Sequence, residues 1–276
     1  MHCCNKTIYL FGNTTFRNVH ITGQANEIYA NFYGLHFAEG ITKAAGVTYT
    51  AKNIYAGTGN KMITDDNFPK KDIAVSDVVL SIDSGDFSYV YGGGRESQTG
   101  STGHSVNITI NGGTIGTLNG SGYYDSNYTG DTIHNGISIA INGGTITNLN
   151  GTREYTVVNG NVEVLFGANV NVSSLYAYVV TGDEILTYKG TDSEALNATF
   201  SKGTRKFSVL KLENSALTVP NESGVSTAWG AFKKVVLTDN SKLSLEMKPS
   251  NTVSVEVTKS GTDWQTTTPI ITAPSG

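Results

Sequence analysis

The sequence has little cysteine and little proline. Among its 276 residues are two cysteines and five prolines. Cys3 and Cys4 are adjacent, so they cannot join distant parts of a fold, and His2 beside them does not complete a zinc site. We therefore expect no disulfide framework, no metal site and no cofactor.

Charge is also scarce. Charged residues make up 15% of the chain, against about 25% in an average globular domain. The net charge is −4, so there is no basic footprint for nucleic acid, which we exclude as a partner. No apolar run reaches the length of about 18 residues that a membrane-spanning helix needs, so we expect no membrane insertion.

The two ends of the chain predict a piece of a longer protein. Residues 1–10 lack the basic and apolar regions of a secretory signal. The other end is rich in Thr, Pro and Ser, a composition typical of extended linkers. We expect a monomeric module with a frayed N-terminal end at 1–7, a β domain at 8–262 and a linker at 263–276.

Glycine is abundant, with 32 residues, and Asn and Thr are frequent throughout. Gly and Asn disfavour helix interiors and Thr favours strands, so a helical bundle is excluded. An internal repeat dominates the middle of the chain. Residues 106–120 read VNITINGGTIGTLNG, residues 137–151 read ISIAINGGTITNLNG, and a degenerate copy, VVLSIDSGDFSYVYG, occupies 78–92.

One repeat unit encodes two strands and two turns. Val106, Ile108 and Ile110 alternate with polar residues, which is the period of a strand with one buried face. Asn-Gly-Gly then permits a sharp turn. A single unit cannot bury its apolar face, but copies stacked ~4.8 Å apart can. The stacked ladders that this predicts are Val78/Val106/Ile137, Leu80/Ile108/Ile139, Ile82/Ile110/Ile141, Phe87/Ile115/Ile146 and Val90/Leu118/Leu149.

The repeat length decides between three all-β folds. A propeller blade needs about 40–45 residues, more than these units contain, and a sandwich predicts no ladders of similar residues. We therefore predict an all-β, single-stranded, right-handed parallel β-helix of roughly ten turns. Within it, residues 191–198 predict one helical turn capped by Thr191 or Asp192.

Several of these phrases resemble a known family. GGTIGTLNG, GGTITNLNG, FSYVYGGG, LFGNTTFRNVHI and EIYANFYGLHFAEGIT are similar to the β-helix regions of large, adhesin-like surface proteins of Gram-positive bacteria, in the pectin-lyase-like fold group. The resemblance spans about residues 8–250. It implies an extracellular location, at the cell surface or cell wall, and it carries no activity with it, because the matching residues are turns and core.

Catalytic motifs of polysaccharide-cleaving β-helices are largely missing. The hydrolases in that group carry Asn-Thr-Asp, Asp-Asp, Gly-His-Gly and Arg-Ile-Lys motifs, and this chain has Asp65-Asp66 and a His104 in Gly-His-Ser. The lyases need an Asp cluster for Ca²⁺ beside a base, and no Asp-rich strand lies next to an arginine. The chemistry must therefore be sought in the segments that interrupt the repeat.

The insertion 121–136, SGYYDSNYTGDTIHNG, is the most aromatic of these segments. Tyrosine faces stack on sugar rings and carboxylates or amides bond to hydroxyls, so a glycan or a host protein is the expected partner. The alternative is a solvated loop whose tyrosines pack on the coil. The candidate ligand-binding residues are Tyr123, Tyr124, Asp125, Tyr128, Asp131, His134, Arg95 and Arg153.

Three carboxylates follow successive glycine-rich turns at similar offsets. Glu96, Asp125 and Glu154 would stack along one edge, with Arg95 and Arg153 beside them. Paired carboxylates can act as acid and base in glycoside cleavage, while the simpler interpretation is a surface Arg–Glu ladder. We therefore expect an adhesin-like binding or stalk module. The alternatives are a glycoside hydrolase or lyase using these carboxylates, and a trimeric receptor-binding spike.

Overall fold

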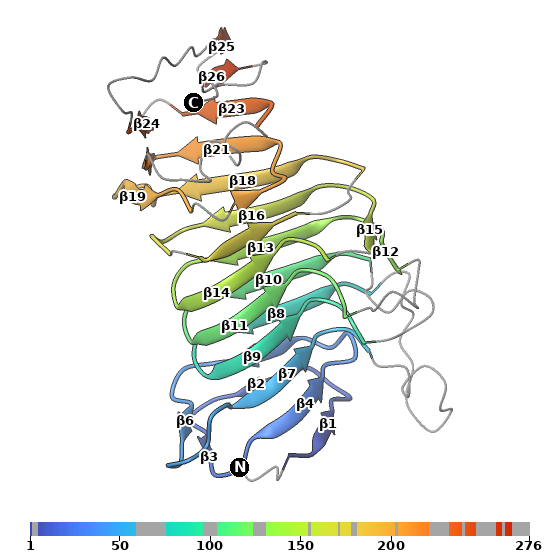
Figure 1. Cartoon of the computed structure of the whole chain (residues 1–276). Helices are drawn as coiled ribbons and strands as arrows, with labels where there is room; N and C mark the ends of the chain where they lie inside the picture. The colour runs from blue at the N-terminus through green and yellow to red at the C-terminus, as the bar shows by residue number, and fades with distance from the viewer. Residues whose placement is uncertain are drawn as a thin grey trace, which may run out of the picture.

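The computed structural model shows a long coil of stacked β-strands (Figure 1). It describes residues 1, 5–58, 76–95, 104–123, 131–153, 156–170, 172–177, 181–201, 204–220, 232–238, 241–246, 258–260 and 263–266. Within these ranges the regular elements are all strands, and none is a helix that could cross a membrane. Successive turns of the chain climb from the N-terminal end to the C-terminal end (Figure 1).

Two large sheets form the walls of the coil. In the eight-stranded sheet every pairing is parallel. Its strands, in spatial order, are β1 (Thr7–Tyr9), β4 (Ala25–Tyr29), β7 (Ala51–Tyr55), β9 (Asp86–Tyr91), β11 (Thr114–Asn119), β14 (Thr145–Asn150), β17 (Ser174–Tyr176) and β20 (Thr204–Arg205).

The eleven-stranded sheet is parallel over nine strands and ends in an antiparallel pair. Its strands, in order, are β2 (Thr14–Phe16), β5 (Leu35–Phe37), β8 (Val78–Ile82), β10 (Val106–Ile110), β13 (Ile137–Ile141), β16 (Val162–Phe166), β18 (Glu184–Lys189), β21 (Val209–Glu213), β23 (Lys234–Leu237), β26 (Asp263–Thr266) and β25 (Thr258–Ser260). The start of the segment expected to be a linker thus lies in β26.

Short third strands complete some of the turns. They form three small parallel sheets, made of β3 (His20–Ile21) with β6 (Thr42–Lys43), β12 (Asp131–Ile133) with β15 (Thr156–Val158), and β19 (Leu196–Thr199) with β22 (Ser215–Val219) and β24 (Lys242–Leu245).

The five predicted ladders are confirmed residue for residue. Ile110, for example, pairs with Ile82 on one side and Ile141 on the other, and all three are fully buried. In the second sheet Leu118 pairs with Val90 and Leu149 in the same way. Inward residues of the two sheets meet in one continuous apolar core that runs along the coil.

The described strands form somewhat fewer turns than the roughly ten that the sequence predicted. Nine parallel strands in one sheet and eight in the other correspond to about 7–9 turns rather than roughly ten. The reason is that some turns carry insertions. The register advances by 36 residues from Ala51 to Phe87 and by 31 from Ile115 to Ile146, both more than the average of 25 that the prediction used.

The predicted helical turn at 191–198 was also wrong. Residues 192–194 form a bend, and β19 begins at Leu196 and pairs in parallel with β22. Strand β22 forms backbone hydrogen bonds with one edge of β19. These bonds outweigh the local preference for a capped helix.

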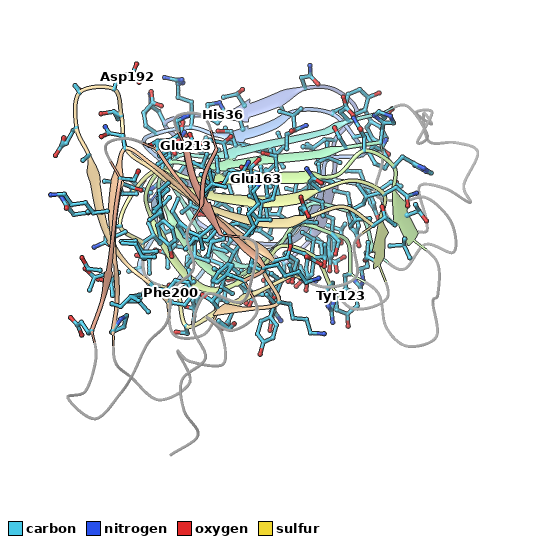
Figure 2. The ribbon with its side chains drawn as sticks, turned by 90° about the horizontal axis from the view of Figure 1, so that it is seen from above. His36, Tyr123, Glu163, Asp192, Phe200 and Glu213 are labelled. Carbon is cyan, nitrogen blue, oxygen red and sulfur yellow. The ribbon has the colours of Figure 1, made fainter. Side chains whose placement is uncertain are left out.

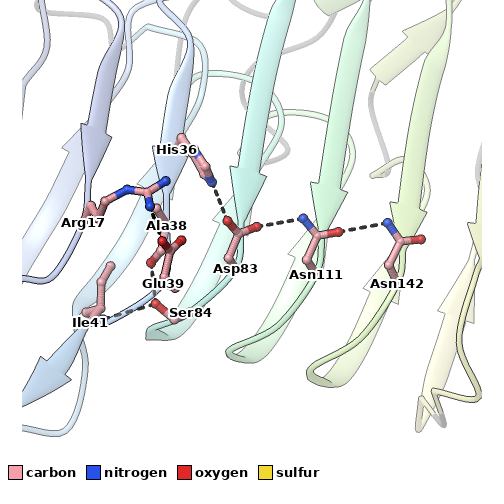
Figure 3. Close-up of polar contacts among 9 residues, drawn as sticks. All are labelled: Arg17, His36, Ala38, Glu39, Ile41, Asp83, Ser84, Asn111 and Asn142. Atoms are coloured by element: carbon pink, nitrogen blue, oxygen red, sulfur yellow. Dashed lines mark hydrogen bonds and ion pairs between the residues drawn. The ribbon is translucent and has the colours of Figure 1, made fainter.

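The Asn-Gly-Gly turns stack as closely as the strands do. Gly113 and Gly144 both have positive φ, at 82° and 84°. Beside them runs a polar ladder, shown in Figure 3, in which Asn142 donates to Asn111 Oδ1 (2.9 Å) and Asn111 donates to Asp83 Oδ1 (2.7 Å). His36 Nε2 lies 2.6 Å from Asp83 Oδ2 and ends the row. The turn residues therefore bond from coil to coil, as the backbone does.

Replacing one inward residue should damage the fold far more than replacing its outward neighbour. Ile110→Asp places a carboxylate in a dry ladder and should lower the free energy of unfolding by more than about 4 kcal/mol. Thr109→Asp, on the outer face between Ser81 and Ala140, should cost less than about 1 kcal/mol. Chemical denaturation measures both, and equal losses would refute this register.

Adding even a methyl group to one of the stacked turns should lower the stability of the protein. A Cβ at Gly113 would lie 2.7 Å from the carbonyl oxygen of Gly85, at a positive φ. Gly113→Ala should therefore destabilise the protein by at least about 1 kcal/mol. Gly12→Ala is the matched control, because no atom lies within 4 Å of its added Cβ. Similar melting temperatures for the two variants would contradict the close packing of the turns.

Candidate functional site

The outer face of the eight-stranded sheet carries a row of stacked tyrosines. Tyr9, Tyr29, Tyr55 and Tyr91 occupy one register position on successive strands. Adjacent ring centroids lie 5.3, 4.8 and 5.0 Å apart, and each pair is nearly parallel. We call these four residues the tyrosine row. On β11 and β14 amides take the same position, and Asn150 donates to Asn119 Oδ1 across 2.7 Å.

A second outward row runs beside the first. It lies two residues earlier on each strand, so its side chains emerge on the same face. Its members are Thr7, Glu27, Asn53, Tyr89, Thr117, Asn148 and Ser174. The row joins hydroxyl, amide and carboxylate groups to one aromatic ring, that of Tyr89, which is 41% exposed. This outer face therefore presents both hydrogen-bonding and stacking groups.

The tyrosine row is buried although it lies outside the solenoid core. Tyr29, Tyr55 and Tyr91 are 5%, 3% and 4% exposed and form an apolar cluster of their own. Stacked rings bury large areas against one another, which stabilises the first turns of the coil, where the Asn-Gly-Gly repeat is missing. The packed tyrosine row therefore forms a well-ordered surface on this face of the sheet.

Glycines bring the insertions to the edge of this surface. Gly92, Gly120 and Gly151 follow β9, β11 and β14 and stack directly on one another, so closely that a Cβ on Gly92 or Gly120 would overlap the carbonyl oxygen of the next one. The chain consequently leaves each turn at the same corner. Arg95 and Tyr123 then pair through a parallel bridge beyond that corner.

Tyr123 packs between the tyrosine row and two arginines. Its ring meets Tyr91 edge to face, with centroids 5.6 Å apart. The guanidinium carbon of Arg153 lies 4.7 Å from the ring centroid of Tyr123, and that of Arg95 lies 6.0 Å from it. Figure 2 shows Tyr123 on the side of the coil opposite His36. These contacts hold the two arginines beside the row.

Arg95, which follows β9, also reaches back over β7 to Glu27 on β4. The Arg95 guanidinium forms an ion pair with Glu27 Oε1, while the hydroxyls of Thr7 and Tyr29 each lie 3.4 Å from Glu27 Oε2. The side chain of Glu27 is 12% exposed. The carboxylate is therefore neutralised and hydrogen-bonded, as a buried charge must be.

These residues surround an open groove of about 500 Å³. Its floor and walls combine tyrosine rings, amides, one threonine hydroxyl and four charged groups. The described lining residues are Glu27, Lys52, Asn53, Tyr55, Tyr89, Tyr91, Arg95, Thr117, Asn119, Tyr123, Asn150 and Arg153. The lining strands β4, β7, β9, β11 and β14 are five neighbours in the sheet, so the groove follows the solenoid axis for about 20 Å.

The predicted site residues divide into three groups. The structure brings Arg95, Tyr123 and Arg153 together at the groove, and their role as ligand-binding residues stays a prediction. His134 is exposed just after β12, the strand that begins at Asp131, and is not among the described lining residues of the groove. The other candidates lie outside the described residues, namely Glu96, Tyr124, Asp125, Tyr128 and Glu154, as do Cys3 and Cys4.

The sequence-based reasoning missed the groove residues on the strands themselves. It treated the strands as wholly occupied with stacking and sought function in the insertions alone. A signal was present, because Ile-Tyr-Ala occurs at 28–30 and again at 54–56, and Tyr-Val-Tyr at 89–91. Recurrent tyrosines that alternate with core residues indicate an aromatic row on the outer face.

Burial keeps the tyrosine hydroxyls protonated. It raises the pKa of Tyr91 to about 12, while the Arg153 charge opposes the rise. Burial raises the pKa of Tyr29 and Tyr55 still further above the ordinary value. At neutral pH these hydroxyls are uncharged and can donate hydrogen bonds. No group of three or more metal-ligating side chains occurs among the residues that the structure describes.

Comparison of the chain with family models, with curated proteins and with solved structures finds no match. The site must therefore be interpreted from its own geometry.

Alkali should unfold the protein as the tyrosine row ionises. Folding raises the pKa of Tyr29, Tyr55 and Tyr91 above the ordinary value of 10.0. The contribution of these protonated tyrosines to the free energy of unfolding is therefore complete below about pH 10 and is lost as the pH rises above it. Thermal melts between about pH 8 and pH 12 should show this decline, with phenolate absorbance appearing together with unfolding. Full phenolate absorbance near pH 10 in a protein that is still folded would contradict the buried row.

Proposed function

We propose that this chain is a glycan-binding β-helix module of an adhesin-like bacterial surface protein, and that the groove over the tyrosine row is its binding site. The observation that carries the proposal is the lining of the groove, where an exposed tyrosine ring lies among amide, hydroxyl and guanidinium groups. Sugars need both kinds of contact, because each ring has apolar C–H faces and a rim of hydroxyls.

Tyr89 is the expected stacking platform. Its neighbour Tyr91 is buried and stacks on it at 6.1 Å between centroids, which holds the exposed ring in place. Around it, Asn53 and Thr117 occupy the same register position on the adjacent strands. A rigid aromatic face flanked by amide and hydroxyl groups favours binding at a low cost in conformational entropy.

The shape of the groove favours a chain-like ligand. Five adjacent strands line it. A spacing of ~4.8 Å between strands repeats similar contacts along the axis. An extended oligosaccharide, or an extended segment of a host protein, could use several of these contacts together, whereas a single sugar would use few.

The extracellular location belongs to the same proposal. It is supported by the resemblance of the repeat phrases to surface β-helices and by the Gly-, Asn- and Thr-rich composition. The alternative, a polysaccharide-cleaving enzyme, needs paired carboxylates. The described part of the groove contains one carboxylate, Glu27, which is ion-paired with Arg95, so that alternative depends on Glu96, Asp125 and Glu154.

Removing the aromatic contacts should abolish binding without unfolding the protein. A glycan array followed by calorimetry identifies the ligand of the wild-type protein, and the variant Tyr89→Ala with Tyr123→Ala should bind it at least tenfold more weakly, since stacking on aromatic anchors dominates such interfaces. Adding Tyr124→Ala and Tyr128→Ala extends the test to the rest of the insertion.

Phe11→Ala is the control, because Phe11 is 46% exposed and is not among the lining residues. It should leave affinity unchanged. A reducing-sugar assay on the same ligand, with Glu96→Gln, Asp125→Asn and Glu154→Gln, detects turnover if the protein is an enzyme. If no glycan binds, or if the double tyrosine variant binds as the wild type does, the groove is not the site.

A further inference from the structure

The described lining of the groove carries a net positive charge in a protein that is acidic overall. The whole chain has a net charge of −4. The described lining of the groove has three cations, Lys52, Arg95 and Arg153, and one carboxylate, Glu27. The positive charges are thus gathered where the ligand would lie, which favours a ligand with anionic groups.

The two arginines differ in whether a described carboxylate balances their charge. Arg95 forms an ion pair with Glu27, so its charge is balanced within the site. For Arg153, no carboxylate lies within ion-pair distance among the residues that the structure describes. Its guanidinium lies over the ring of Tyr123, and its backbone N–H donates a hydrogen bond to Ser121 Oγ, at 2.9 Å. Within the described part of the structure, no ion pair balances the positive charge of Arg153.

The contact with Tyr123 also orients the guanidinium. When a guanidinium lies over an aromatic face, its N–H groups, which point outward in its own plane, stay available for other acceptors. Arg153 is half-buried at the wall of the groove. A planar fork held in this way matches the two oxygens of a carboxylate or of a sulfate ester.

Lys52 lies at some distance from Arg153 along the same groove. Lys52 is exposed on β7, while Arg153 follows β14, and β9 and β11 lie between these two strands. Along the solenoid axis three strand spacings separate them, or about 14 Å. The two cations could therefore contact separate anionic groups on one extended chain.

We propose that the ligand of this groove is an anionic oligosaccharide, and that Arg153 determines this specificity by binding a carboxylate or sulfate group on a sugar. The inference rests on the proposed glycan-binding function and deepens it. Lys52 adds a second, weaker contact, because a flexible ammonium is exposed to solvent and screened.

Three sets of oligomers test the proposal and separate the two sources of charge. Agarose oligomers are neutral galactans, carrageenan oligomers are sulfated galactans, and alginate oligomers carry carboxylates. The wild-type protein should bind at least one of the two anionic sets with at least tenfold higher affinity than the neutral set. This preference should weaken as salt is raised, because a half-buried ion pair is partly screened.

The variant Arg153→Gln should lower affinity for the anionic oligomer by roughly tenfold to a hundredfold, and Arg153→Lys should recover only part of the loss. Affinity for neutral oligomers should stay unchanged in both. Arg17→Gln is the matched control, since Arg17 pairs with Glu39 on another turn and does not line the groove. Melting temperatures close to the wild-type value show that the variants are folded.

The variant Glu154→Gln addresses the carboxylate next in sequence to Arg153. It should leave anionic binding equal or stronger, because it removes a negative charge. Equal affinity for neutral and anionic oligomers, or full binding by Arg153→Gln, would overturn the inference while the glycan-binding proposal stands. No binding in any of the three sets, nor on the glycan array, would overturn both.

Discussion

Parallel stacking at one strand spacing per turn is the constraint on which the rest of this structure depends. Every residue in a strand must meet its counterpart one turn away at ~4.8 Å. Like side chains therefore meet like side chains, and the result is favourable for isoleucine on isoleucine, tyrosine on tyrosine and asparagine on asparagine. The ladder of Ile82, Ile110 and Ile141 and the row of stacked tyrosines are two results of the same rule.

Because of the same constraint, inward residues determine stability and outward residues are available for recognition. Inward ladders hold the two sheets together, so the residues at inward positions must stay apolar. Outward rows contribute less to the core, so their chemistry can change from turn to turn while the backbone stays unchanged. On one face the outward position passes from tyrosine at Tyr91 to asparagine at Asn119. The groove lies where this change occurs, and it therefore contains both stacking and hydrogen-bonding groups.

The fold could be predicted from the sequence because each repeat unit is a short, contiguous stretch of the chain. Asn-Gly-Gly marks the turn, alternating apolar residues mark the strand, and a constant offset aligns Val106 with Ile137. The site was predictable only in part. Arg95, Tyr123 and Arg153 were found because they follow marked turns. Glu27, by contrast, lies 68 residues before Arg95 in a region without the marker, and an insertion hides the register between them. The outward tyrosines were not predicted to form a row, because no sequence rule links rings from turns of unequal length.

The stacked corner at Gly92, Gly120 and Gly151 has a consequence for how such a protein can change. Because backbone meets backbone there, the coil beneath has the same shape whatever the length of the segment that follows. Insertions can lengthen, shorten or be exchanged between turns without disturbing the ladders, while their first residues always arrive beside the tyrosine row. The corner thus acts as a fixed attachment point, and new ligand preferences can arise by exchanging loops on an unaltered scaffold.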